Sequence, residues 1–138
     1  MNVDLVTRSW LNLWNGDYDV AKDLVSDDIR VHAALADGGD GTAVSGRDGL
    51  VGWISQVRAT FSSLTFSIEV GPIAQNNHLA VRWIANGIYG GGFPGASAPI
   101  GTPISFAGTD LLRTDEDHLA EYWVNSDMHV LLTQLQVG

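Results

Sequence analysis

The residues with the clearest chemical potential lie in segment 119–127 (Leu-Ala-Glu-Tyr-Trp-Val-Asn-Ser-Asp), which is typical of a strand that ends where a short helix begins. Side chains alternate along a strand, so Glu121, Trp123, Asn125 and Asp127 share one face. Apolar, aromatic surroundings raise the pKa of a carboxyl by desolvation and make it a usable acid or base near neutral pH. The other interpretation is that Asp127 caps the terminal helix by accepting backbone N–H bonds, and spacing alone favours this.

A second group that could move protons is His32, in the alternating segment 29–35, which predicts a strand. The apolar residues of this segment occupy one parity, and His32 lies with Arg30 on the other. If the sheet is covered on one face only, His32 is solvated and has no role. If the sheet curls around a cavity, His32 lines it. The pattern alone favours the solvated position.

Composition excludes several classes of protein. With 138 residues and 45% hydrophobic content we expect a single domain over residues 1–138, with a core that needs no disulfide. The absence of cysteine excludes thiol chemistry and Cys-ligated zinc. A net charge of −9 with only seven Lys and Arg argues against nucleic-acid or anionic-membrane partners. No signal-peptide pattern or apolar run of ~20 residues is present, so we expect a cytoplasmic protein.

One loop has the composition of a metal site without its ligand pattern. Residues 38–41 (Gly-Gly-Asp-Gly) suggest a calcium loop, but the later ligands and terminal glutamate of an EF-hand are missing. We therefore reject a calcium site in this loop.

The elements that must position these residues follow from hydrophobic periodicity. Apolar spacing predicts helices over residues 3–14, 17–25 and 50–61, and strands over 29–35, 65–73, 79–89, 104–113 and 119–127, before a short terminal helix. This order is typical of the α+β class. A strongly curved antiparallel sheet with helices against its inner face would form a cone with an apolar cavity. Gly87 and Gly108 suit the bends that such curvature needs.

Two further features concern binding. Residues 90–103 form an apolar loop rich in glycine and proline that includes Phe93, and loops of this length are often lids or binding loops. In the predicted strands both parities carry apolar residues, with Ile84 and Ile88 opposite Trp83. A sheet covered on one side alternates more cleanly, so we predict a homodimer through the outer sheet face.

Several segments together resemble the SnoaL-like polyketide cyclase family of the nuclear transport factor 2-like superfamily. The resemblance covers residues 10–135 and rests on residues 28–32 (Asp-Ile-Arg-Val-His), 46–50 (Gly-Arg-Asp-Gly-Leu), 82–83 leading into Gly87, 101–110 (Gly-Thr-Pro-Ile-Ser-Phe-Ala-Gly-Thr-Asp), 121–123, Asp127 and 131–135. It implies a conical barrel, nuclear transport factor 2-like or cystatin-like, in which a strongly curved antiparallel or mixed sheet wraps around N-terminal helices.

The resemblance also implies a chemistry. The founding cyclases close a ring by intramolecular aldol condensation without metal or cofactor, with an aspartate at the Asp127 position as general acid/base and pocket histidines assisting. His32 matches the first histidine. Tyr89 stands in the segment where the second lies, and a phenol can donate a hydrogen bond to an enolate oxygen but exchanges protons less readily than imidazole.

Other enzymes of this superfamily give contrasts. Epoxide hydrolases of the limonene type need an arginine and an aspartate on one strand face, whereas Asp110 and Arg113 are on opposite faces here. Ketosteroid isomerases combine a base aspartate with a tyrosine–aspartic acid oxyanion hole, and Tyr89, Asp110 and Asp127 offer the same residue types. The other interpretation of Asp110 is a buried carboxylate that only accepts structural hydrogen bonds.

We therefore expect an enzyme that binds a small hydrophobic carbonyl compound and performs cofactor-free acid/base chemistry, either aldol ring closure or a related isomerisation. Asp127, His32 and Tyr89 are the candidate catalytic residues. The candidate ligand-binding residues are aromatic side chains and one carboxylate: Trp14, Trp53, Trp83, Phe93, Phe106, Asp110 and Trp123. The alternatives are a non-catalytic domain that binds a hydrophobic ligand and a scaffolding module whose pocket is filled by core side chains.

Overall fold

The structure is a computed structural model that describes residues 2–33 and 44–138. The rejected calcium loop at 38–41 and the end of the predicted strand 29–35 lie outside the described residues.

Helices lie within the first 59 residues of the chain and near its end. α1 (Val3–Trp14) is capped by Asn2, whose side chain accepts the Leu5 backbone N–H at 3.1 Å. The apolar stripe of this helix is buried as predicted. The predicted second helix is shorter, because a 3₁₀ turn (η1, Tyr18–Val20) and a single turn (α2, Ala21–Leu24) already lead into a strand at Val25. α3 spans Arg47–Ala59 and α4 spans Met128–Gln134. No helix in the described part of the chain is long and apolar enough to cross a membrane.

Five strands in the described part of the chain form one sheet, which confirms the predicted α+β class. They are β1 (Val25–His32), β2 (Phe61–Gln75), β3 (His78–Tyr89), β4 (Pro103–Asp115) and β5 (His118–Ser126), arranged in the order β1-β5-β4-β3-β2. β1 runs parallel to β5, and the other neighbours are antiparallel. The sheet is therefore mixed.

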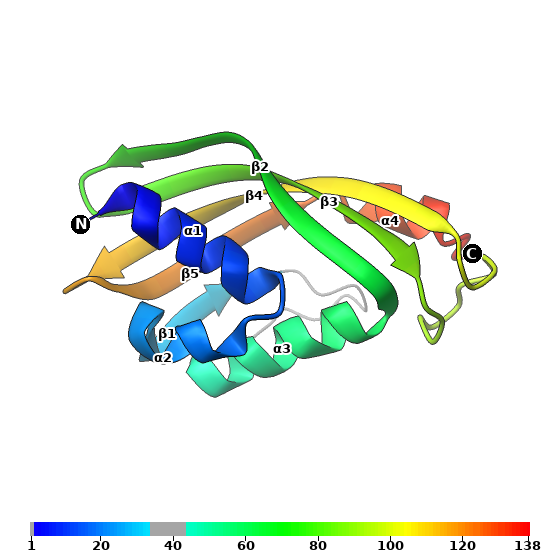
Figure 1. Cartoon of the computed structure of the whole chain (residues 1–138), viewed down its shortest axis with the longest axis horizontal. Helices are drawn as coiled ribbons and strands as arrows, with labels where there is room; N and C mark the ends of the chain where they lie inside the picture. The colour runs from blue at the N-terminus through cyan, green and yellow to red at the C-terminus, as the bar shows by residue number, and fades with distance from the viewer. Residues whose placement is uncertain (1, 34–43) are drawn as a thin grey trace.

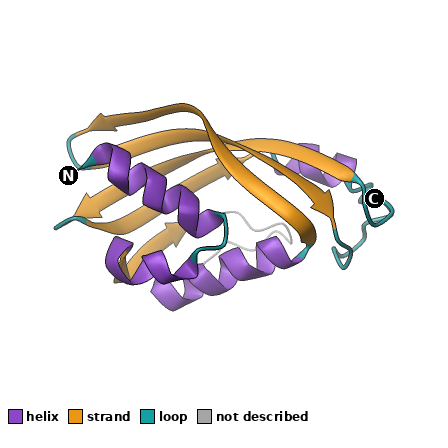
Figure 2. Cartoon of the chain, in the orientation of Figure 1, coloured by secondary structure: helices purple, strands orange, loops and turns teal. Residues whose placement is uncertain are grey.

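The sheet curves strongly over the helices but is not a closed barrel, since β1 and β2 are its two edges. α1, α2 and α3 lie on its inner side (Figures 1 and 2). α4 lies at the other end, where the Gln134 side chain accepts the Ser105 N–H at 2.7 Å and donates to its carbonyl at 2.8 Å. This arrangement leaves a space between the inner sheet face and the helices.

Alternation along the strands decides which side chains face that space. Val81 and Trp83 of β3 share one parity and are buried on the inner side. On β4, Asp110 is buried inside, while Arg113 contacts Glu121 on the outer face, so the predicted separation of Asp110 and Arg113 is confirmed.

Gly87 and Gly108 allow atoms of other residues to approach the strands closely, in addition to any bend that they permit. The carbonyl oxygen of Ser63 occupies the space beside Gly87 that a Cβ atom would need. At Gly108 a Cβ atom would lie 2.8 Å from Cε2 of Trp83. Glycine at 108 therefore allows the Trp83 indole to pack directly against the backbone of β4.

Candidate active site

A cavity of about 290 Å³ lies between the inner sheet face and the helices. Its wall is mainly aromatic, because α1, α3 and four strands all direct large rings toward it. The residues that line it include Trp14, Trp53, Trp83, Phe93, Phe106 and Asp110, six of the seven candidate ligand-binding residues. An apolar wall with few polar groups is the usual form of a site for a small organic ligand.

Asp110 is the charged residue in this wall, and its side chain is held by three donors from three elements. Trp10 of α1 donates its indole N–H to Oδ2 at 2.9 Å. Trp83 of β3 donates its indole N–H to Oδ1 at 2.9 Å, and Tyr122 of β5 donates its hydroxyl to the same oxygen at 3.2 Å. Asp110 is only 3% exposed, so these bonds replace the water that it loses.

Burial dominates the acidity of this carboxyl group. Loss of water raises the pKa of Asp110 from 3.8 to about 6, against the three hydrogen bonds from Trp10, Trp83 and Tyr122, which lower it. The group is therefore mostly ionised at neutral pH, yet a pKa near the working pH is what proton transfer in both directions requires.

The hydrogen bonds also define where Asp110 can accept a proton. An ionised carboxylate has about four lone-pair sites, two on each oxygen. Oδ1 accepts from both Trp83 and Tyr122, whereas Oδ2 accepts only from Trp10. The remaining acceptor site is therefore on Oδ2, and Asp110 is one of the residues that line the cavity.

Asp127 is placed differently from either interpretation of the sequence. It occupies the N-cap position of α4, but its side chain makes no capping hydrogen bond. It does not line the cavity either: Oδ2 lies 3.7 Å from Nη2 of Arg82, and the side chain is 45% exposed. Asp127 does lie on the same side of the sheet as Trp123, as predicted, but this is the outer side.

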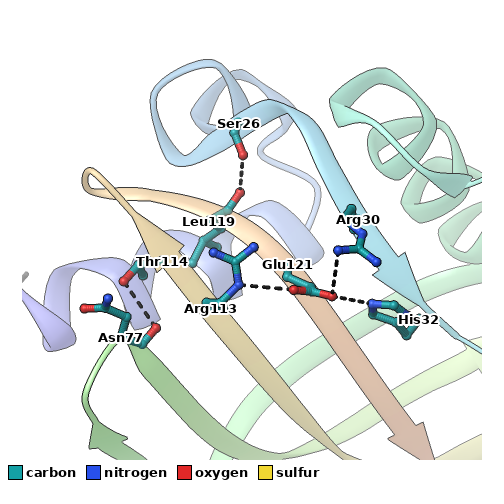
Figure 3. Close-up of polar contacts among 8 residues, drawn as sticks. All are labelled: Ser26, Arg30, His32, Asn77, Arg113, Thr114, Leu119 and Glu121. Carbon is teal, nitrogen blue, oxygen red and sulfur yellow. Dashed lines mark hydrogen bonds and ion pairs between the residues drawn. The ribbon is translucent and has the colours of Figure 1, made fainter.

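His32 and Trp123 also lie on the outer face, away from the cavity (Figure 3 shows His32). Nε2 of His32 is 2.6 Å from Oε2 of Glu121, and the two rings of His32 and Trp123 stack with centroids 5.2 Å apart. Arg113 donates to Oε1 of Glu121 at 3.1 Å, and Arg30 lies 3.8 Å from Oε2. The bond from His32, followed by the arginines, holds the pKa of Glu121 below its usual 4.5 despite partial burial. His32 therefore belongs to an outer ionic cluster.

Tyr89 is buried but does not line the cavity. Its hydroxyl oxygen accepts the backbone N–H of Phe93 at 3.0 Å. Phe93 is the member of the 90–103 loop that lines the cavity, and the loop is tied to the chain end by the Ser97 and Ala98 N–H groups, which donate to the Leu135 carbonyl. Tyr89 thus fixes the loop that supplies Phe93.

Trp10 and Tyr122 are the site residues that the sequence did not reveal. Trp10 belongs to the apolar face of α1, and apolar spacing does not distinguish a core residue from one that lines a site. Tyr122 has the opposite parity to Trp123, so it faces inward once Trp123 faces outward. The signal that could have found both was the buried polar residue Asp110, which needs donors from neighbouring elements.

The described residues offer no ready metal site. In residues 2–33 and 44–138, no three His, Asp or Glu side chains are arranged to hold a metal ion.

Comparison with known proteins agrees with this architecture. Over 99% of the chain, the structure matches that of IdmH from Streptomyces antibioticus with a TM-score of 0.82 and 24% identity, covering 100% of IdmH. TsrD from Streptomyces laurentii matches 99% of the chain with a TM-score of 0.82 and 18% identity, covering 96% of TsrD. A SnoaL-like polyketide cyclase from Agrobacterium tumefaciens matches 98% of the chain with a TM-score of 0.75 and 17% identity, covering 98% of that protein. The chain matches none of the curated proteins by sequence.

The sequence comparison gives the family directly. The family model described as SnoaL-like polyketide cyclase matches residues 4–135, almost the whole chain. The solved structures that resemble it have the nuclear transport factor 2-like fold, with the same curved sheet over N-terminal helices. The chain therefore belongs to the SnoaL-like polyketide cyclase family.

Proposed function

We propose that the cavity binds a small, largely apolar carbonyl compound and that Asp110 is the base that removes a proton next to the carbonyl. The observation that carries this proposal is a buried carboxylate in an aromatic wall, with a pKa of about 6 and one free acceptor site. Membership of a cyclase family supports chemistry of the cyclase type. The role that the sequence suggested for Asp127 passes to Asp110.

The reaction follows from this geometry. Oδ2 of Asp110 takes a proton from the carbon beside the carbonyl, and the C–H electron pair becomes the C=C bond of an enolate whose oxygen carries the charge. The enolate carbon then attacks a second carbonyl carbon of the same molecule, forming a C–C bond. The oxygen of that second carbonyl takes up the proton, so the ring closes with no other reactant. If the proton instead returns to a different carbon, the result is an isomerisation.

Proton removal can be tested without the natural substrate. 2-Acetylnaphthalene is an apolar ketone whose methyl protons exchange with solvent through the enolate. In D₂O, ¹H NMR should show loss of the methyl signal faster with the protein than with buffer, and the rate should rise with pH through about 6 as Asp110 ionises.

Asp110→Asn is the decisive variant, because an amide has nearly the same shape but cannot take the proton. Its exchange rate should fall to the buffer rate. Exchange by the wild type that persists undiminished in folded Asp110→Asn would contradict the role of Asp110.

A non-catalytic binding domain is the second candidate function, and one observation favours it. Asp110 joins α1, β3 and β5 through its three hydrogen bonds, so its burial also has a structural explanation. A wild-type protein that binds 2-acetylnaphthalene but never accelerates its exchange would support this alternative. A scaffolding module is disfavoured because the cavity of about 290 Å³ is not filled by core side chains.

A further inference from the structure

Ser126 carries a hydroxyl on the cavity side of β5, close to Asp110. It is the last residue of β5 and pairs with Gly108 of β4, two residues before Asp110. Val124 pairs with Asp110 and lines the cavity, so alternation along the strand directs Ser126 to the same inner face. Ser126 is half-buried and is itself one of the residues that line the cavity. Its hydroxyl therefore faces the space in which a ligand would lie.

The spacing of Ser126 and Asp110 fits a carbonyl group. The two residues are diagonal neighbours on adjacent antiparallel strands, and such neighbours lie about 7–8 Å apart. A hydrogen bond to a carbonyl oxygen takes about 2.8 Å, and a base approaches the adjacent carbon to about 3–3.5 Å. A carbonyl group with its neighbouring carbon thus fills the distance. The Trp83 ring covers Gly108 between the two side chains and supplies a surface for the ligand to pack on.

The cavity wall has no cation that could hold the charge of an enolate. Among the described residues that line the cavity, none is Lys, Arg or His. The negative charge that develops on the carbonyl oxygen must therefore be stabilised by neutral donors. Such donors contribute most when the fold holds them in place before the reaction, as it holds a short side chain on a strand.

Most of the neutral donors in this wall are engaged or closed off. Three of them already donate to Asp110, namely Trp10, Trp83 and Tyr122. The indole N–H of Trp14 is inaccessible to water, so a ligand in the cavity does not reach it. These four side chains therefore leave the carbonyl oxygen without a donor.

Ser126 is the best placed of the donors that remain. Trp53 and Thr60 belong to α3 and its C-terminal cap, not to the strands beside Asp110. Asn125 pairs with Thr109 on the opposite parity of β5, and the Thr109 side chain contacts Arg82 on the outer face. Within residues 2–33 and 44–138 the Ser126 hydroxyl makes no hydrogen bond, so it is available to a ligand.

We propose that the Ser126 hydroxyl donates a hydrogen bond to the carbonyl oxygen of the ligand and stabilises the enolate while Asp110 takes the proton. This inference rests on the proposed function, because it gives Ser126 the oxygen of the carbonyl whose neighbouring carbon meets Asp110. The hydrogen bond strengthens as the proton leaves, since its acceptor becomes an anion. Ser126 therefore contributes more to the rate of proton removal than to binding.

The test compares two probes of nearly the same shape, 2-acetylnaphthalene and 2-ethylnaphthalene, by titration against the wild type and Ser126→Ala. The wild type should bind the ketone about fivefold more tightly than the hydrocarbon, the value of one net neutral hydrogen bond. Ser126→Ala should bind both equally. At saturating ketone, its rate of methyl-proton exchange in D₂O should fall about tenfold or more, because hydrogen bonds to charged groups are stronger.

Two further variants separate the hydroxyl from general effects of substitution. Ser126→Thr keeps the hydroxyl and should retain most of the ketone preference and of the exchange rate. Ser67→Ala is the matched control, because Ser67 is exposed on β2 between the buried Phe66 and the cavity-lining Ile68. Removal of its hydroxyl should change neither quantity.

A spectroscopic measurement reports the hydrogen bond directly. A hydrogen bond to a carbonyl oxygen withdraws electron density from the carbonyl carbon and moves its ¹³C signal to higher frequency. With 2-acetylnaphthalene labelled at this carbon, the signal of the bound ketone should lie at higher frequency in the wild type than in Ser126→Ala.

An unchanged ketone preference in Ser126→Ala, or the same carbonyl signal in the two proteins, would overturn the role of Ser126. The proposed function survives either result if exchange is still lost in Asp110→Asn. The opposite outcome is also distinguishable. A ketone preference lost in Ser126→Ala, with exchange as fast in Asp110→Asn as in the wild type, would contradict the proposed base and support Ser126 as the donor to the ligand.

Discussion

The indole ring of Trp83 occupies the space above Gly108, where a Cβ atom would lie 2.8 Å from Cε2. The two residues face each other across the β3–β4 pair. This close approach brings Nε1 of Trp83 within 2.9 Å of Oδ1 of Asp110, two residues further along β4. The position of the candidate base therefore depends on the absence of a side chain at 108.

Gly108→Ala should displace Trp83 and break its bond to Asp110. Overpacking of this kind costs about 1–3 kcal/mol, and we expect a loss of that size in the free energy of unfolding, measured by urea denaturation. The matched control is Gly52→Ala in the exposed middle of α3, where no atom lies within 4 Å of the added Cβ. Alanine there should stabilise the protein by about 0.5–1 kcal/mol. Equal effects of the two changes would contradict the packing argument.

Asp110 should titrate near neutral pH. Because burial raises its pKa to about 6, its side-chain carboxyl ¹³C signal should change with a midpoint about two units above that of a solvated aspartate. A midpoint at the ordinary aspartate value of ~3.9 would show that Asp110 is not desolvated.

The raised pKa of Asp110 also predicts how stability depends on pH. Between about pH 4 and 6 the folded state binds the proton more tightly than the unfolded state, so stability falls as pH rises, by up to about 3 kcal/mol. Glu121 has the opposite sign, because its pKa is lowered and its contribution is lost as pH falls. In Glu121→Gln, urea denaturation should therefore show more clearly the fall in unfolding free energy that Asp110 causes as pH rises. In the double variant with Glu121→Gln and Asp110→Asn, this fall should disappear.

Asp127→Asn should have little effect. The carboxylate is 45% exposed and lies 3.7 Å from Arg82, and exposed ion pairs contribute less than about 1 kcal/mol. We expect a change in unfolding free energy within that limit and an unaltered rate of ketone exchange, since the side chain does not line the cavity. Loss of exchange in a folded Asp127→Asn variant would restore the role that the sequence suggested.

We predict a homodimer through the outer sheet face, which carries a row of apolar residues across four strands. Ile73, Ala80, Leu111 and Trp123 are successive partners across β2, β3, β4 and β5, and Ile73 is 62% exposed. A second copy of the chain is the occupant that we predict for this row. Sedimentation velocity at micromolar concentration should show a dimer for the wild type and a monomer for Leu111→Asp. Ile100→Asp is the control, because Ile100 is 75% exposed but lies outside the sheet, and this variant should stay dimeric.

Much of the fold could be predicted from the sequence because it depends on local periodicity. The apolar spacing of α1, the alternation of β3 and the order of elements were enough for the α+β class, and the motifs were enough for the family. The same alternation correctly separated Asp110 from Arg113 and grouped Trp123 with Glu121. These properties need only neighbours along the chain.

The sequence by itself determined which residues share a face, and only the tertiary structure decided which face is inside. A period of two divides a strand into two sets but does not say which set meets the helices. Trp123 and Tyr122 are both large and aromatic, so hydrophobicity does not tell which of them faces the helices. The prediction that Trp123 faces inward placed Asp127 inside as well, because the two residues share a parity. The structure buries Tyr122 against Asp110 instead, and it brings Trp10 to that carboxylate across 100 residues of chain. Such a contact arises only when the helix packs on the sheet, because no local pattern specifies it.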